Sequence, residues 1–252
     1  MALSRQTARR ASAGLVAVAS AAIVAAAPAV ARADDTTAAR RAAAARDQGR
    51  PYTMAEVGAS FLTLPAAEVC PFSVHNCKHG EASLSLGIHF LYRDKEWGVG
   101  AGIEWATTLR TDAANGDTSL ERDHSRRYFL VEGQVRYYPL RRPLWEWWTG
   151  ATFGGVIVND SWSERADRSP PSDADIQGPR AATLGTEGIA AGVGTGVEWL
   201  FARNWSLGAD FRYASWFLPT TRDVLPTGDV ASLSGRVDMF ELGVLLSYRI
   251  AL

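Results

Sequence analysis

The sequence has few cysteines, few histidines and almost no net charge, and each shortage excludes a class of protein. Its 252 residues include 2 Cys and 4 His, which is too few for a disulfide-dense scaffold or a four-cysteine zinc site. The 26 basic residues balance 27 acidic ones, so the formal charge is -1 and the basic excess of a nucleic-acid-binding protein is missing. The 9 Trp, 7 Tyr and 9 Phe exclude a disordered chain. What remains is an ordered protein with one large β domain or two small ones.

The N-terminus has the pattern of an export signal. Residues 1–10 carry three arginines and no acid, residues 11–30 are almost wholly small and apolar, and Ala31-Arg32-Ala33 has the form that signal peptidase cuts. A membrane-spanning helix is the alternative, although such an Ala-rich stretch inserts weakly. We therefore predict a cleaved signal peptide at 1–33, a polar periplasmic tail at 34–51 and a β domain at 52–252.

From Tyr52 onward the hydrophobic pattern has a period of two, which is the signature of β-strands. In 240–252, seven apolar residues alternate with residues that are mostly small or charged. This run is longer than an average soluble strand and suits a tilted strand that crosses a bilayer, which needs about 9–11 residues. The same two-row pattern predicts eight strands, at 52–64, 82–93, 97–106, 127–138, 145–158, 189–201, 205–213 and 240–252.

The connections between these segments alternate strictly in length. Short joins lie at 94–96, 139–144 and 203–204, and long ones at about 65–81, 107–126, 159–188 and 218–236. Outer-membrane barrels have this arrangement, because their short turns face the periplasm and their long loops face outside. We therefore predict an all-β, eight-stranded antiparallel transmembrane barrel with both termini in the periplasm.

The composition of the two rows indicates which one faces lipid. A soluble lipocalin-like carrier would turn the apolar row inward around a ligand. The other row here is rich in Gly, Ser, Glu and Arg, which suits a narrow lumen where glycines leave room for long charged side chains. Aromatic residues gather near the short-turn ends, as a belt at a membrane interface does: Trp97, Tyr137, Trp145, Trp147, Trp199, Trp205 and Tyr248.

The stretch GVGTGVEWLFARNWSLGADFRYASW at 192–216 resembles the penultimate hairpin of small Gram-negative outer-membrane barrels, the OmpA, OmpX and OmpW-like proteins. The terminal FELGVLLSYRIAL at 240–252 is similar to the signal that barrel-assembly machinery recognises, and the residues that would carry it are Phe240, Tyr248, Ile250 and Leu252. The resemblance implies an outer-membrane location, with lipid, lipopolysaccharide and the assembly machinery as partners and with no cofactor.

The inward row predicts a polar network inside the barrel, because enclosed charges must pair or form hydrogen bonds. An eight-stranded lumen is only wide enough for side chains. A narrow pore gated by Arg–Glu switches is the alternative. We expect double substitution of Glu104 and Arg136 to destabilise the barrel without creating a large conductance. The predicted network consists of Glu56, His89, Arg93, Glu104, Glu132, Arg136, Glu146, Glu198, Asp210, Arg212, Glu241 and Arg249.

The first long loop holds Cys70 and Cys77, with His75 and His79 close by. Export favours a Cys70–Cys77 disulfide that closes the loop. A zinc or copper site is the alternative, since His and Cys ligands bind these metals.

An enzyme is a further alternative, because some small barrels act on lipid at the loop rim with a Ser or Asp beside a His. His124, which lies between Asp123 and Ser125 at the end of the second long loop, is the sole candidate. Sequence neighbours face opposite sides of a strand, so this run is not itself a triad. The acidic third loop, 159–188, lacks the ligand spacing of a calcium loop.

We therefore predict a non-enzymatic outer-membrane protein with a structural or surface-interaction role. The alternative is passive transport of a small solute, such as a hydrophobic one, through a porin-like barrel. Any external partner would contact the long loops.

Overall fold

The computed structural model describes residues 51–67, 80–109, 112–113, 122–164 and 180–252. These residues form nine strands: β1 (Tyr52–Leu64), β2 (Glu81–Asp94), β3 (Trp97–Thr108), β4 (Asp112–Ala113), β5 (Arg122–Arg141), β6 (Trp145–Glu164), β7 (Ala181–Leu200), β8 (Trp205–Phe217) and β9 (Arg236–Ala251). Within this described part of the chain, no helix is long and apolar enough to cross a membrane.

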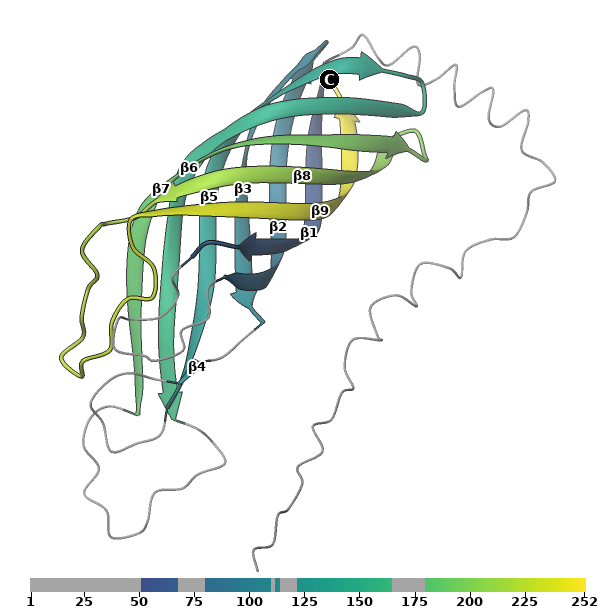
Figure 1. Ribbon diagram of the computed structural model, residues 1–252. Coiled ribbons are helices and arrows are strands. Elements are labelled where there is room, and N and C mark those ends of the chain that lie inside the picture. The colour runs from purple at the N-terminus through teal and green to yellow at the C-terminus, as the bar shows by residue number, and fades with distance from the viewer. Residues whose placement is uncertain (1–50, 68–79, 110–111, 114–121, 165–179) are drawn as a thin grey trace, which may run out of the picture. The chain divides into compact units, whose positions relative to one another are not determined.

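Eight of the strands form a closed antiparallel ring (Figure 1). Each strand pairs with its neighbours in sequence, β1 pairs with β9, and β3 pairs with β5 to complete the circle. The two-residue strand β4 pairs with the start of β5, outside the ring proper. The predicted eight-stranded barrel is thus confirmed, and closure leaves the ring without an unpaired edge.

The two rows face as the sequence predicts. In β9, Leu242 is 63% exposed and Val244 54%, whereas their neighbours Glu241 and Gly243 are buried. The same alternation occurs in the other strands of the ring. The apolar row therefore covers the outside of the barrel, which is opposite to a lipocalin-like carrier.

Three short connections lie at one end of the ring, which we call the short-turn end; the opposite end is the loop end. The aromatic residues of the short-turn end stand opposite one another on neighbouring strands. Trp97 is paired with Tyr137, Trp145 with Trp199 and Trp205 with Tyr248. Rings in two of these pairs lie within 5 Å, at 4.9 Å for Trp97–Tyr137 and 4.8 Å for Trp205–Tyr248. These contacts form an aromatic belt at one edge of the apolar surface.

The strand lengths differ from the prediction on one side of the barrel. Strands β5, β6 and β7 each have 20 residues and continue past their neighbours at the loop end (Figure 1). The segments 122–126, 159–164 and 181–188, predicted as parts of long loops, are therefore strand. The prediction failed because polar residues occupy both rows there, so the hydrophobic alternation disappears while the backbone ladder continues. Strands β8 and β9 also extend further toward the loop end, to Phe217 and back to Arg236.

Candidate functional site in the barrel lumen

The lumen at the short-turn end is filled by paired arginines and glutamates. Arg93 forms a bidentate ion pair with Glu146, with N–O distances of 2.7 and 3.1 Å. Arg249 bridges Glu146 and Glu198 at 2.8 Å each. Every one of these side chains is at most 11% exposed. Buried charges are stable only when they are paired in this way, so we call this group the lower ion cluster.

Arg136 belongs to the same cluster and links it to the middle of the barrel. Its guanidinium makes a bidentate pair with Glu56, at 2.6 and 2.9 Å, and approaches Glu198 at 3.8 Å. It also lies 4.1 Å from the centre of the Trp148 ring, a cation–π distance. Trp148 fits inside the lumen because Gly196 faces it: a Cβ there would lie 2.8 Å from the indole.

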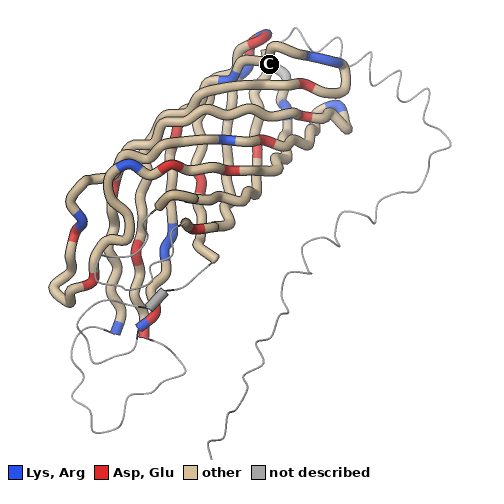
Figure 2. Tube along the Cα trace, in the orientation of Figure 1, with Lys and Arg blue, Asp and Glu red and all other residues tan. Residues whose placement is uncertain are grey.

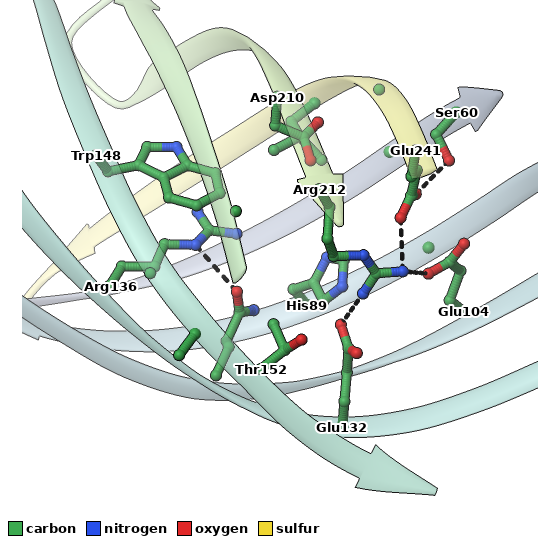
Figure 3. Close-up of a pocket in the computed structure, with 18 of the residues that line it drawn as sticks. Ser60, His89, Glu104, Glu132, Arg136, Trp148, Thr152, Asp210, Arg212 and Glu241 are labelled. Atoms are coloured by element: carbon green, nitrogen blue, oxygen red, sulfur yellow. Dashed lines mark hydrogen bonds and ion pairs between the residues drawn. The ribbon is translucent and has the colours of Figure 1, made fainter. Parts of the chain in front are cut away.

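The middle of the lumen is organised around Arg212 (Figure 3). Its guanidinium pairs with Glu104 and Glu132 and contacts Glu241 at 2.6 Å. Ser60 donates a hydrogen bond to Glu241. One arginine from β8 thus ties together glutamates from β3, β5 and β9, and we call this group the Arg212 cluster.

A small cavity lies between the two clusters. It is lined by His89, Arg136, Trp148, Asp210 and Arg212, among others, and the space open to the centres of water-sized molecules is about 40 Å³. A single water needs about 10–15 Å³ on this measure. The cavity therefore has room for a few waters. The His89 ring occupies space that Gly102 leaves free, since a Cβ on Gly102 would overlap it.

Carboxylates outnumber guanidinium groups inside these two clusters and their cavity. Four arginines face seven acidic residues there, so not every carboxylate has a guanidinium group of its own. The arginines are Arg93, Arg136, Arg212 and Arg249, and the acids are Glu56, Glu104, Glu132, Glu146, Glu198, Asp210 and Glu241.

The structure places all of the predicted network residues in the lumen: ten belong to these two clusters, and His89 and Asp210 line the cavity between them. Glu104 pairs with Arg212, and Arg136 with Glu56, so a double substitution at Glu104 and Arg136 breaks two different clusters. Among the described residues, no group of His, Cys, Asp or Glu side chains is arranged to hold a metal ion. The predicted Cys70–Cys77 disulfide and its metal alternative lie outside the described residues.

The loop-end half of the lumen contains an apolar core that was not predicted from the sequence, beside a buried ion pair between Arg126 and Glu81. Leu62, Leu130, Val156, Trp216 and Met239 all point inward and are at most 1% exposed. They belong to one continuous core, together with side chains of the connection between β8 and β9. These residues occupy the inward row. The change from polar to apolar residues along that row could therefore have predicted the apolar core from the sequence.

The connection between β8 and β9, residues 218–235, folds back over the loop end of the lumen, and we call it the cap loop. Its Asp229 pairs with Arg122 at 2.8 Å, and both side chains are 0% exposed. The backbone N–H of Ser232 donates to Asp160 at 2.9 Å. Leu218 and Leu233 complete the apolar core below. The long connection was predicted at 218–236, but the burial of Asp229 and Leu233 within it was not.

His124 lies in this region and not at an open rim. It is in strand β5, 4% exposed, with its Nε2 atom 2.7 Å from Asp160 and its ring stacked 4.8 Å from Trp162. Its sequence neighbours Asp123 and Ser125 belong to the opposite row. The carboxylate beside His124 is thus Asp160, from a segment predicted as part of the third loop.

No protein-family model matches the chain, and no curated protein matches it. By structure it is similar to Neisserial surface protein A, with 14% identity and a TM-score of 0.48 over 79% of this chain and 97% of that one. It is also similar to a major outer membrane protein of Thermus thermophilus, with 15% identity and a TM-score of 0.47 over 79% of this chain and 99% of that one. For OprG, an outer membrane protein of Pseudomonas aeruginosa, the identity is 12% and the TM-score 0.38 over 81% of this chain and 99% of that one. These similarities are to small outer-membrane barrels and concern the fold alone.

Proposed function

We propose that this chain is an outer-membrane barrel of a Gram-negative bacterium with a structural or surface-interaction role and no catalytic activity. The observation that supports the membrane location is the outer surface. Large apolar side chains, including Phe90, Phe153 and Leu242 at 63–65% exposure, cover it around the ring. An exposed apolar surface that encircles a closed barrel is what a membrane-spanning barrel presents to lipid. The short turns and both termini would then face the periplasm and the long loops the outside.

The filled lumen favours a structural or surface role over transport. Along the barrel, the lower ion cluster, the Arg212 cluster, the apolar core and the cap loop follow one another, and the cavity between the clusters holds only a few waters. The extended parts of β5, β6 and β7 would themselves reach beyond the membrane surface, and two of the long loops follow or precede them in the sequence. We propose that these loops make any external contact, with lipopolysaccharide around the barrel.

Two measurements on the outer-membrane fraction test this proposal. Unboiled protein is expected to migrate at a different apparent mass from boiled protein, because a closed ladder of hydrogen bonds survives in detergent until it is heated. The same protein in planar bilayers is expected to show no stable large channels. A soluble periplasmic protein without a gel shift would contradict the membrane location, and stable large channels would contradict the sealed lumen.

The outward row of β9 supports a second partner. Phe240, Tyr248 and Ile250 all point away from the lumen at the end of the chain. We propose that the barrel-assembly machinery reads them there during insertion.

Transport of a small hydrophobic solute is the second candidate, and the apolar core in the loop-end half of the lumen favours it. Such a route requires the cap loop to leave the mouth. Replacing Asp229 by Asn removes the charge that holds Arg122, so we expect at least about ten-fold faster proteolysis within the cap loop, since local opening controls cleavage. Asp223→Asn changes an exposed carboxylate of the same loop and is the control. Uptake of a small apolar dye by Asp229→Asn vesicles, but not by the control, would favour transport; equal proteolysis of both variants would show that the ion pair does not hold the loop.

A further inference from the structure

Two neighbouring turns at the short-turn end form one rigid surface. The β5–β6 turn and the β7–β8 turn are joined by a hydrogen bond from the backbone N–H of Leu200 to the carbonyl of Leu144, at 2.8 Å. The backbone N–H of Arg249 donates to the carbonyl of Asn204, also at 2.8 Å, and fixes the second turn to β9. The backbone positions that carry the side chains of these turns are therefore fixed relative to one another.

The charges on these two turns are all of one sign. Arg141, Arg142 and Arg203 lie there, and residues 139–145 and 199–205 contain no Asp or Glu. Arg142 and Arg203 are exposed, while Arg141 is partly covered and contacts Glu96 at 3.5 Å. Figure 2 shows basic residues at both turns. We call these two turns, which carry Arg141, Arg142 and Arg203, the basic turn pair. The third short turn offers a contrast, because its Lys95 stands between Asp94 and Glu96.

The basic turn pair lies immediately beyond an aromatic and apolar zone. Trp145 and Trp205 are 38% and 41% exposed, and Trp199, at the end of β7, is 54% exposed. Tryptophans of this kind sit at the headgroup level of a membrane. In a barrel placed by its apolar surface, the arginines next to them reach the depth of the lipid phosphates. A guanidinium group matches a phosphate well, because its planar fork can donate two parallel hydrogen bonds.

We propose that the basic turn pair binds the headgroup phosphates of anionic phospholipids in the leaflet that faces the short turns. This inference rests on the proposed membrane location. A lipid fits this surface better than a soluble acidic partner, because the tryptophans beside the arginines require apolar contacts and the arginines require a phosphate at the same depth. The β2–β3 turn adjoins this surface through the Arg141–Glu96 contact, but its two acids and one lysine give it no basic excess.

Fluorescence quenching by brominated lipids tests the proposal on the full chain, folded in phosphatidylcholine vesicles. Brominated phosphatidylglycerol is expected to associate with the protein several-fold more strongly than brominated phosphatidylcholine, and this preference should weaken at high salt. The double variant Arg142→Gln/Arg203→Gln is expected to lower this preference to less than about two-fold, given the contribution of each basic residue near an anionic surface. Lys95→Gln, the matched control, should leave it within error of the wild type.

The outcomes separate the inference from the function on which it rests. The gel shift of unboiled protein, measured on the same vesicles, reports whether the barrel is folded. Folded wild-type protein that quenches equally with both lipids overturns the lipid site and leaves the membrane location intact. Equal preference in the wild type and the double variant overturns it as well. If the double variant instead loses binding to a soluble acidic cell-wall peptide while its lipid preference is unchanged, the surface belongs to that partner and the proposal fails. A wild-type chain that does not insert at all overturns both.

Discussion

Replacing Arg212 by methionine is expected to lower the free energy of unfolding by about 3–5 kcal/mol, the range found when one partner of a buried ion pair is removed. Arg212 contacts Glu104, Glu132 and Glu241, and all three carboxylates are buried. Methionine fills part of the volume but supplies no charge and no hydrogen-bond donor. Unfolding by urea in lipid vesicles, followed by the loss of the gel shift, measures the effect.

Glu104→Gln is the control for this substitution, because it changes the same cluster in the opposite electrostatic direction. The cluster already has more carboxylates than guanidinium groups, so removing one negative charge relieves repulsion while the amide oxygen still accepts from Arg212. A change of less than about 1 kcal/mol is expected, the ordinary net value of one hydrogen bond. If Arg212→Met proved as stable as Glu104→Gln, the guanidinium would not be what holds these strands together in the lumen.

The same pair of variants also bears on transport. Loss of Arg212 removes the central side chain of the lumen, yet the apolar core and the cap loop still close the loop end. We therefore expect no large channel from Arg212→Met even where enough folded protein is recovered for measurement. This matches the expectation for the double substitution at Glu104 and Arg136.

The ring itself was predictable because its signal is local and repeated. Each strand between the short turns alternates large apolar residues with small or charged ones, and β1 was placed at the residues where the structure has it. The extended parts of β5, β6 and β7 were not predictable from hydrophobicity, because residues such as Arg122 and His124 on the inner face are as polar as Asp123 and Ser125 on the outer face. The β structure there is maintained by backbone pairing with the neighbouring strand, and the sequence pattern does not reveal this pairing.

The lumen shows the same division between local and distant information. Whether each charged side chain points into the lumen follows from the row that it occupies. Its partner does not, because Arg212 and Glu104 are 108 residues apart and Arg122 and Asp229 are 107 apart. Such pairs depend on how far each strand is shifted along the next when the ring closes. The burial of the cap loop has the same origin, since Asp229 is buried only because Arg122 extends above the ring.

Alanine at Gly154 is expected to destabilise the barrel strongly, whereas alanine at the adjacent Gly155 is expected to be harmless. A Cβ on Gly154 would overlap the carbonyl oxygen of Val131 and lie 2.6 Å from the Cα of Glu132. These are backbone atoms of the paired strand β5, so they cannot move aside without breaking the ladder. A Cβ on Gly155 meets only the Gly188 carbonyl, at 3.8 Å, which is an ordinary contact.

The expected loss for Gly154→Ala is about 1–3 kcal/mol or more, as for other overpacked sites. Gly155→Ala should instead gain about 0.5–1 kcal/mol, because alanine loses less backbone entropy than glycine on folding. The urea midpoint of the gel-shifted species measures both. The two positions are one residue apart on β6, so composition, membrane depth and strand propensity are the same for both. Only the direction differs: Gly154 points inward, where a Cβ would meet the backbone of β5, and Gly155 points outward. Equal midpoints for the two variants would mean that this close approach does not exist in the folded barrel, and that the inward glycines leave room for side chains but are not required by the backbone.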